Sequence, residues 1–461
     1  MITDTLTLEI ANGINDRSAR GIATAIGRMI SSGELVIGAQ LPTVRQLSRK
    51  LGVSPTTVGE AWRSLAEVGA IETLGRNGSF VRQPTGPGGP RRYRQVAADS
   101  DHHGHFALDL STGTPDSTLL PDLSTALARV SSQALTSSYL DHPVLPQLEE
   151  ALRHRWPFVP EEVTVVDGAM DALDRIAQVV VRLGDRVVVE HPTFPPLLDL
   201  LEQIGADVIG IEVDAQGMNV EALTVALEQK PTALFLQPRA QNPTGVTMTA
   251  QRAQEIAEAI VASGHSESIT IIEDDHAGDI AVGELNSIGH FLPTRTVHIR
   301  SYSKSHGPDL RLAAVGGAGD VISAAANRRL LGPGWSSRIL QAVLLELLDD
   351  ETTLEALSHA RDEYSRRRRE VVKILNDRNV FSTGTDGINL WVRVSDERSA
   401  LMTLAAQGIG AAPGSPFFVN AHPDSIRLTV GLLGATSDLE ATAQAIASAA
   451  NTSGSGRRGQ R

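Results

Sequence analysis

The sequence predicts a multi-domain chain, in which a small α+β head at the N-terminus is followed by a large α/β body. Residues 83–90 read QPTGPGGP, and this many prolines and glycines sustain neither a helix nor a central strand. Three helical patterns and a short strand pair precede that stretch, whereas strands and helices alternate after it. Residues 1–94 carry twelve basic and seven acidic side chains, although the whole chain has a net charge of −13. A basic head on an acidic body indicates separate partners for the two parts.

The composition is that of an ordinary globular protein, and it excludes several kinds of site. Hydrophobic residues make up 41% of the 461 residues and charged residues 21%. No run approaches the ~20 apolar residues of a membrane helix, and acids at Asp4, Glu9 and Asp16 argue against a signal peptide. The chain has no cysteine, which removes disulfides, thiol catalysis and thiolate metal sites. We therefore expect a cytoplasmic protein.

We expect four segments along the chain. The head spans 1–83, and a linker that is semi-stiff where its prolines cluster spans 84–106. The body spans 107–450. Residues 451–461 contain no apolar side chain, so we expect this tail to be disordered.

In the head, three helices precede a two-stranded hairpin. Gly33 ends the first helical pattern, and Gly52 forms a tight turn after the second. Ser54 is a suitable N-cap and Pro55 a suitable first residue for the third helix. The helices are expected at about 22–30, 43–51 and 55–68, and the strands at 70–74 and 79–81.

This order of elements is the plan of a winged helix-turn-helix, in which the third helix enters the major groove of DNA. Residues 15–82 resemble the GntR family of regulators through the segments SGEL, LPTVRQLSRKLGVSPTTVGEAWRSL and GAIETLGRNGSFV. Relatives often carry arginines where this chain has Pro55 and Gly59, which weakens the expectation of base readout there. The hydroxyl side chains of Ser54, Thr56 and Thr57 could also serve only to cap the third helix. The resemblance implies DNA contacts by Arg45, Ser54, Thr56, Thr57, Arg76 and Gly78.

In the body, apolar runs typical of strands alternate with amphipathic helical patterns. This alternation implies a mainly parallel sheet that is covered on both faces. Ligands of such sheets bind beyond the carboxyl ends of the strands. The strands are predicted at 163–166, 186–190, 233–237, 270–273 and 296–301, with helices such as 169–182 and 250–263 between them.

Four short motifs follow these strands in order. Lys304 in Ser301-Tyr-Ser-Lys304 comes just after a strand, where its amine can reach a bound aldehyde. Asp167-Gly-Ala-Met170 lies between a strand and a helix, which is typical of phosphate-binding turns. Asn242-Pro-Thr-Gly245 and Glu273-Asp-Asp-His276 each follow a strand, and an acid at that place can keep a pyridine ring protonated. Each motif alone is weak, but four in this order indicate one site.

With these motifs, residues 107–447 resemble a fold-type I, class I aminotransferase, which implies pyridoxal 5'-phosphate as the cofactor. By that resemblance Lys304 forms a Schiff base with the cofactor, while Asp274 pairs with the pyridine nitrogen and Asn242 with the ring 3-hydroxyl. Arg427, in the segment IRLT, is expected to bind a carboxylate, although a sulfonate or a phosphate could use the same arginine. The other cofactor-binding residues that the resemblance implies are Phe194 on the ring face, Ala169, Met170, Ser301 and Arg311 at the phosphate, and Tyr139 at the phosphate of the partner subunit.

Two positions depart from the aminotransferase pattern. Many relatives have a tyrosine, which donates to the ring 3-hydroxyl, where this chain has His276. Histidine can donate a similar bond but titrates near neutrality, so its charge would depend on pH; it could also merely fill the space. The usual glycine after the Tyr139 motif is replaced by Val144-Leu-Pro146.

Two further signals carry less weight. Asp101-His-His-Gly-His105 lies in the linker without partners at helical spacing, so we expect no metal site there. Arg366-Arg-Arg-Arg369 falls within a helical pattern over 354–375. We expect these arginines to form a solvated face or contacts between subunits rather than a nucleic-acid site.

A GntR-type head joined to an aminotransferase-like body is the architecture of the MocR group of bacterial regulators, which the chain resembles along nearly its whole length. The resemblance implies a homodimer that binds double-stranded DNA, with heads that can dock on the partner subunit. A small amine or amino acid, or pyridoxal phosphate itself, is then expected to gate DNA binding. The alternative is an active aminotransferase with an accessory DNA-binding head, because every required catalytic residue is present.

Overall fold

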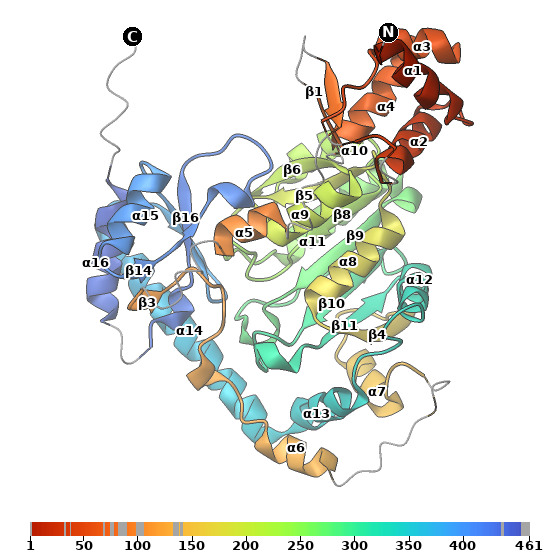
Figure 1. Cartoon of the computed structure of the whole chain (residues 1–461). Helices are drawn as coiled ribbons and strands as arrows, with labels where there is room; N and C mark the ends of the chain where they lie inside the picture. The colour runs from red at the N-terminus through yellow and green to blue at the C-terminus, as the bar shows by residue number, and fades with distance from the viewer. Residues whose placement is uncertain are drawn as a thin grey trace. The chain divides into compact units, whose positions relative to one another are not determined.

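The fold of the chain is shown by a computed structural model (Figure 1). It describes residues 2–31, 34–36, 38–67, 70–73, 78–81, 90–97, 106–131, 138, 142–434 and 438–452. The chain forms two units, which are considered separately. One contains residues 1–91 with 182–185 and 199–207, and the other contains 92–181, 186–198 and 208–461.

The described part of the head confirms the three predicted helices and the strand pair. Its elements are α1 (Ile2–Asn12), α2 (Ala19–Ser31), α3 (Val44–Leu51), α4 (Pro55–Glu67), β1 (Ile71–Thr73) and β2 (Ser79–Val81). Helix α1 was not predicted, because three threonines in ITDTLTLEIAN lower its helix propensity. Thr43 and Gln46 form a capping box at the start of α3, and Gly52, with φ 70°, ends that helix.

The head has an apolar core of its own. Ile22, Ile26, Leu47 and Val58 are completely buried and come from α2, α3 and α4. The apolar side chains of each helix recur every three or four residues, so one face of each helix is buried. The exposed faces of α3 and α4 remain available to a partner.

The body is built on an eight-stranded sheet in the order β4-β11-β10-β9-β8-β5-β6-β7. The pairs β5/β8, β8/β9 and β9/β10 are parallel, whereas β11 is antiparallel to both β10 and β4. The mainly parallel sheet is therefore confirmed for its four central strands, whereas β6, β7 and β11 were not predicted. The strands are β4 (Glu162–Val166), β5 (Arg186–His191), β6 (Asp207–Asp214), β7 (Gly217–Met218), β8 (Ala233–Leu236), β9 (Thr270–Asp275), β10 (Thr296–Ser301) and β11 (Ala313–Gly317).

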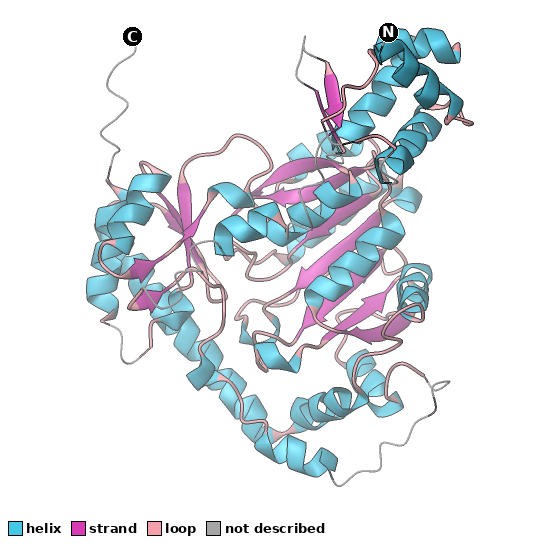
Figure 2. Ribbon diagram, in the orientation of Figure 1, coloured by secondary structure: helices cyan, strands magenta, loops and turns pink. Residues whose placement is uncertain are grey.

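Helices cover this sheet, as Figure 2 shows. Leu234, Leu236 and Ile271 on the strands pack with apolar residues of α10 and α11. Helix α8 contacts β4, β10 and β11 and packs against α12. The helices around the sheet are α6 (Ser124–Ser131), α7 (Pro146–His154), α8 (Ala169–Val180), α9 (Pro195–Ile204), α10 (Val220–Leu227), α11 (Ala250–Ala262), α12 (Gly319–Arg329) and α13 (Arg338–Asp349).

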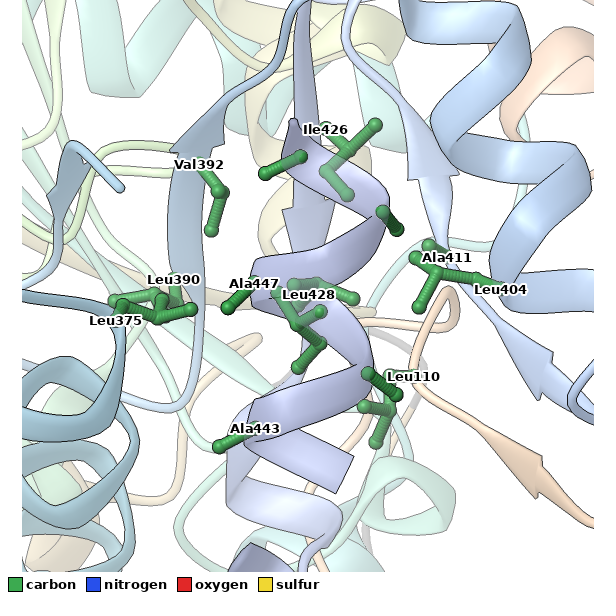
Figure 3. Close-up of a cluster of buried hydrophobic side chains, with 14 of the residues drawn as sticks. Leu110, Leu375, Leu390, Val392, Leu404, Ala411, Ile426, Leu428, Ala443 and Ala447 are labelled. Carbon is green, nitrogen blue, oxygen red and sulfur yellow. The ribbon is translucent and has the colours of Figure 1, made fainter. Parts of the chain in front are cut away.

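A smaller sheet in the order β12-β13-β16-β15 forms the C-terminal part of the body. Its core includes Leu390 and Val392 of β13 and Ile426 and Leu428 of β16, as Figure 3 shows. Nearby, β14 (Ile409–Gly410) pairs with β3 (Leu108–Asp109) in a separate two-stranded sheet. The other elements here are α14 (Glu351–Asp377), β12 (Ser382–Thr383), β13 (Leu390–Arg393), α15 (Glu397–Ala405), β15 (Ala412–Pro413), β16 (Ser425–Leu428) and α16 (Leu439–Ala450).

The arginine run on α14 corrects one expectation. Arg366 is paired with Glu363 and Glu370 at the surface, but Arg367 and Arg368 are each only 3% exposed. Arg367 forms an ion pair with Asp116 at 2.8 Å, and Arg368 donates to backbone carbonyl groups of the loop after β12. The solvated face that was expected is therefore wrong for these two residues, which fasten α14 to its surroundings.

The segment predicted as a linker contains a helix that was not predicted, α5 (Arg91–Ala97). Residues 82–89 and 98–105, including the histidine cluster before Phe106, lie outside the described residues. The tail is described only as far as residue 452. None of the described helices is both long enough and apolar enough to cross a membrane.

The small-sheet core predicts a large cost for truncation of one leucine. Leu428→Ala should lower the free energy of unfolding by about 2–5 kcal/mol, because Leu428 is completely buried and the change leaves a cavity. Denaturant unfolding measures this difference. Leu354→Ala is the control, since Leu354 is 50% exposed. Equal stability losses in the two variants would contradict the packing.

Candidate functional site

A cavity of about 130 Å³ lies beyond the ends of β8, β9 and β10, where the sequence predicted the site. Nine of the ten residues expected at the cofactor line it. Tyr139, the tenth, lies outside the described residues. The lining residues are Ala169, Met170, Phe194, Asn242, Asp274, His276, Ser301, Lys304 and Arg311, together with Leu173, Gln237 and Ser303.

One end of the cavity is shaped to hold an anion. Helix α8 begins at Ala169 with no side-chain cap, so its first backbone N–H groups can bind a ligand. Arg311 lies beside this turn and donates through Nη2 to the carbonyl oxygen of Asp167 at 3.1 Å. Gly168 has φ 99°, and a Cβ there would lie 2.9 Å from Nη2 of Arg311. Glycine is thus required for the guanidinium to approach the helix start.

At the other end, Asp274 presents a carboxylate oxygen without a partner. Its Oδ2 accepts from Nε2 of Gln237 at 2.7 Å, while Oδ1 is buried and has no partner among the described residues. Burial raises the pKa of Asp274 to about 6, against the Gln237 hydrogen bond and the charge of Lys304. A buried carboxylate oxygen of this kind requires a hydrogen-bond donor from a ligand.

Gln237 connects two of the predicted residues and was missed by the sequence analysis. Its Nε2 donates to Asp274, and its Oε1 accepts from the backbone N–H of Asn242 at 2.8 Å. Glu190 accepts from the backbone N–H of Gln237 at 3.0 Å, and burial raises the pKa of Glu190 to about 8. The position of Gln237, at the end of a predicted strand and five residues before Asn242, was the available signal.

Asp275 is held by a separate set of charges. Arg239 donates to both carboxylate oxygens, at 3.1 and 2.6 Å, and Arg300 lies 3.5 Å away. Although burial opposes it, these two arginines hold the pKa of Asp275 well below its usual range. Successive side chains of β9 point to different sides, so only Asp274 of the adjacent acids reaches the cavity.

His276 does not behave as expected. Burial, together with the positive charge of Lys304, lowers the pKa of His276 to about 4. Its Nε2 lies 2.9 Å from the carbonyl oxygen of Ala240, which can only accept, so Nε2 carries the proton. The expectation that this ring changes charge near neutrality is wrong, because the ring is neutral there. The ring donates its one N–H to the backbone carbonyl group of Ala240, and Nδ1 can only accept a hydrogen bond.

Lys304 is a buried amine with a lowered pKa. Its Nζ donates to the carbonyl oxygen of Gly113 at 2.7 Å. Burial and the nearby Arg427 lower the pKa of Lys304 to about 8. A substantial fraction of the amine is therefore unprotonated near neutral pH, as addition to an aldehyde requires.

Arg427 lies on β16 close to the same loop. Nη2 of its guanidinium donates to the carbonyl oxygen of Ser111, and a Cβ on Gly113 would lie 3.0 Å from its Nη1. The side chain is 3% exposed and forms no ion pair with any described carboxylate. Burial lowers the pKa of Arg427 to about 10. A buried guanidinium without a carboxylate partner is suited to bind an anionic ligand.

These features together fit pyridoxal phosphate, the cofactor that the motifs imply. The helix start and Arg311 match its phosphate, and the unpartnered oxygen of Asp274 matches its ring N–H. Asn242 lies in the same cavity, and Lys304 supplies the amine that its aldehyde requires. The site thus offers a complementary group for each polar group of the cofactor.

In the head, Arg45 and Thr56 are exposed on α3 and α4. Ser54 accepts from the backbone N–H of Thr57 at 3.1 Å, so its hydroxyl caps α4 in the absence of DNA. Gly78 has φ 98°, which favours glycine at the end of the wing turn. Arg76 lies outside the described residues.

The hydrogen bonds of Gln237 predict weaker cofactor binding when its side chain is made apolar. Gln237→Leu should lower the affinity for pyridoxal phosphate by about 5- to 100-fold, because a second oxygen of Asp274 loses its donor. Titration of the apoprotein, followed by visible absorbance, measures this affinity. Gln254→Leu, on the exposed face of α11, is the matched control. An unchanged affinity of Gln237→Leu would refute the role of this side chain.

The pKa of Lys304 predicts the pH dependence of cofactor capture. Because only the neutral amine adds to an aldehyde, the capture rate should rise about tenfold per pH unit from pH 6.5 and level off above pH 8. Stopped-flow absorbance measures the rate, with Lys304→Ala as the control that shows no band. A rate that is flat between pH 6.5 and 8 would contradict the lowered pKa.

Comparison with known families assigns both parts of the chain. The family "Aminotransferase class I and II" matches residues 107–446, and the family "Bacterial regulatory proteins, gntR family" matches residues 18–81. The aspartate aminotransferase of Thermus thermophilus, at 22% identity, superposes with a TM-score of 0.68 over 78% of this chain and 99% of its own. The α-aminoadipate aminotransferase LysN of the same organism, at 20% identity, gives 0.67 over 78% and 97%.

Two relatives that match along most of the chain are regulators. The vitamin B6 salvage pathway transcriptional repressor PtsJ of Salmonella typhimurium is 32% identical over 91% of this chain and 96% of its own length. The transcriptional regulator TauR of Rhodobacter capsulatus is 26% identical over 84% and 87%. Since the head, the aminotransferase fold and the pyridoxal phosphate site occur together here, the chain belongs to the MocR-type transcriptional regulators, which join a GntR-type DNA-binding head to a class I/II aminotransferase domain.

Proposed function

We propose that a small amine or amino acid, recognised beside the cofactor, sets the affinity of this regulator for its operator. The observation that carries the proposal is that Lys304 and Arg427 lie beside the same loop residue: Lys304 donates to the carbonyl oxygen of Gly113, and a Cβ on Gly113 would lie 3.0 Å from Nη1 of Arg427. A reactive amine and a buried guanidinium that forms no ion pair with any described carboxylate together match an amino acid. Both lie in a chain whose head binds DNA.

Each side chain of the site has a proposed task. When bound, pyridoxal phosphate supplies an aldehyde that combines reversibly with primary amines. Lys304 would hold the cofactor through its amine. Asp274, positioned by Gln237, holds a proton at the ring nitrogen, and Asn242 orients the ring oxygen. Phe194 covers the ring face; Ala169, Met170, Ser301 and Arg311 hold the phosphate.

Arg427 selects for a carboxylate on the effector. Its guanidinium donates only to the carbonyl oxygen of Ser111 among the described residues, so N–H groups remain for a ligand. A carboxylate can accept two parallel hydrogen bonds from a guanidinium, which an amine without an acid group cannot. An amino acid therefore fits better than a simple amine.

A second candidate signal is pyridoxal phosphate itself. The relative PtsJ is named as a repressor of vitamin B6 salvage and is 32% identical to this chain. Under this proposal, occupation of the site by the cofactor alone changes operator affinity. The two signals are separated by measuring operator binding of apoprotein and cofactor-loaded protein without added amines.

We further propose that the protein acts as a homodimer in the cytoplasm, where DNA is available to its two heads. Tyr139 would reach the phosphate of the partner subunit, and each head could dock on the partner's body. Two heads held by one dimer can contact two half-sites of an operator. Arg45, Thr56, Thr57 and the wing around Arg76 and Gly78 are the proposed DNA contacts, with Ser54 at the start of the recognition helix.

The proposed phosphate contact of Arg45 predicts a change in salt dependence. Arg45→Ala should weaken binding to the DNA upstream of the gene and reduce the slope of log affinity against log salt by about 1 per head. Fluorescence anisotropy over a salt series measures this slope. Arg398→Ala, at an exposed position on α15, controls for loss of charge. An unchanged slope in Arg45→Ala would remove Arg45 from the contacts, and rapid transamination without specific DNA binding would overturn the regulatory role.

A further inference from the structure

Helix α5 is fastened to the body by two contacts on one face. Nη1 of Arg92 donates to the carbonyl oxygen of Phe418 at 2.8 Å and to that of Pro416 at 3.4 Å. Val96, one helical turn later, packs against the cluster of Trp391, Phe417 and Phe418. Residues four apart lie on the same face of a helix, so this face of α5 lies against segment 416–418 and Trp391, while Arg91 at its start pairs with Glu202 at 3.5 Å. In Figure 1, α5 is drawn in orange close to β16, the strand that pairs with β13, which carries Trp391.

The same aromatic cluster contacts Arg427. The guanidinium carbon of Arg427 lies 5.4 Å from the centre of the Phe417 ring. Trp391 is the direct partner of Arg427 in the β13/β16 pairing, and its ring lies 5.5 Å from Phe417 and 5.6 Å from Phe418. Arg427 and α5 therefore share the same aromatic side chains.

Segment 416–418 is also connected to the cofactor cavity. The carbonyl oxygen of Phe417 accepts from the backbone N–H of Thr193 at 2.9 Å. Thr193 directly precedes Phe194, which lines the cavity. The hydrogen bond from Thr193 therefore opposes a displacement of Phe417. Such a displacement also moves the residues that α5 contacts.

We infer that α5 responds to the occupancy of Arg427, and that Phe417 carries the response. A carboxylate forms charge-assisted hydrogen bonds that are stronger than the attraction of a guanidinium to a ring face. A bound carboxylate therefore draws the guanidinium away from Phe417. Segment 416–418 then relaxes, which weakens both the hydrogen bonds that Arg92 donates to it and the apolar contact of Val96.

This inference rests on the proposed function, because it states how an effector carboxylate reaches the segment between body and head. The coupling must be reciprocal, so release of α5 changes the carboxylate affinity by the same factor. A coupling in the usual range for such sites corresponds to a change of roughly fivefold or more.

Hydrogen–deuterium exchange on the cofactor-loaded full chain tests the inference. Arg427→Met and Phe417→Leu should each raise amide exchange in 92–97 by roughly fivefold or more, because each breaks one step of the path. Arg393→Met is the matched control, since Arg393 lies on the neighbouring strand β13 with an exposed side chain. The amides of β8 report in every variant whether the fold is intact. If Arg427→Met does not fold, Phe417→Leu and Arg427→Lys decide the result. The exchange rate in 92–97 of Arg427→Lys should lie between that of the wild type and that of Phe417→Leu.

Each outcome decides the inference. Faster exchange in 92–97 for the Arg427 and Phe417 variants, with Arg393→Met unchanged, supports it. Exchange equal to wild type in those variants overturns it, as does an equal rise in the control.

Standard L-amino acids form a second arm of the experiment. An amino acid that changes the visible absorbance must also raise exchange in 92–97, and one that changes the absorbance alone contradicts the coupling. Loss of operator binding would refute the proposed function without altering this result, because the exchange is read within the body.

Discussion

The buried carboxylate of Asp274 is the group on which the arrangement of the site depends. One oxygen is fixed by Gln237, and the other has no partner among the residues that the structure describes, which is costly inside a protein unless a ligand supplies a donor. The same amide group of Gln237 accepts from the backbone of Asn242, so Asn242 after β8 and Asp274 on β9 are positioned as one unit. The parallel pairing of these two strands places both at the same edge of the sheet.

The effector side of the site is built on a different sheet. Arg427 comes from β16, whereas Lys304 follows β10, and the loop at Ser111 and Gly113 contacts both side chains. A ligand that bridges the lysine and the arginine therefore connects the eight-stranded sheet with the four-stranded sheet. Phe417 extends this connection to α5, which is the segment that leads toward the head in the sequence.

Most of the fold and of the cofactor site could be predicted, because both follow local patterns. Strands such as 296–301 and motifs such as Ser301-Tyr-Ser-Lys304 are recognisable in isolation. Strand β11 could not be predicted, since Ala-Ala-Val-Gly-Gly has little strand propensity and is held only by its neighbours. The roles of Gln237 and Arg239, the burial of Arg367 and Arg368 and the neutral ring of His276 depend on contacts between distant segments. Such contacts leave no periodic signal in the sequence.

The central claim is that an amine that binds beside Lys304 changes the affinity of the protein for its operator DNA. The most direct test measures operator affinity of the wild-type chain and of Lys304→Ala across the standard amino acids, with pyridoxal phosphate present. We predict that at least one amino acid changes the affinity of the wild type by about fivefold or more and leaves Lys304→Ala unchanged. Affinities that change equally in both proteins, or in neither, would contradict the account.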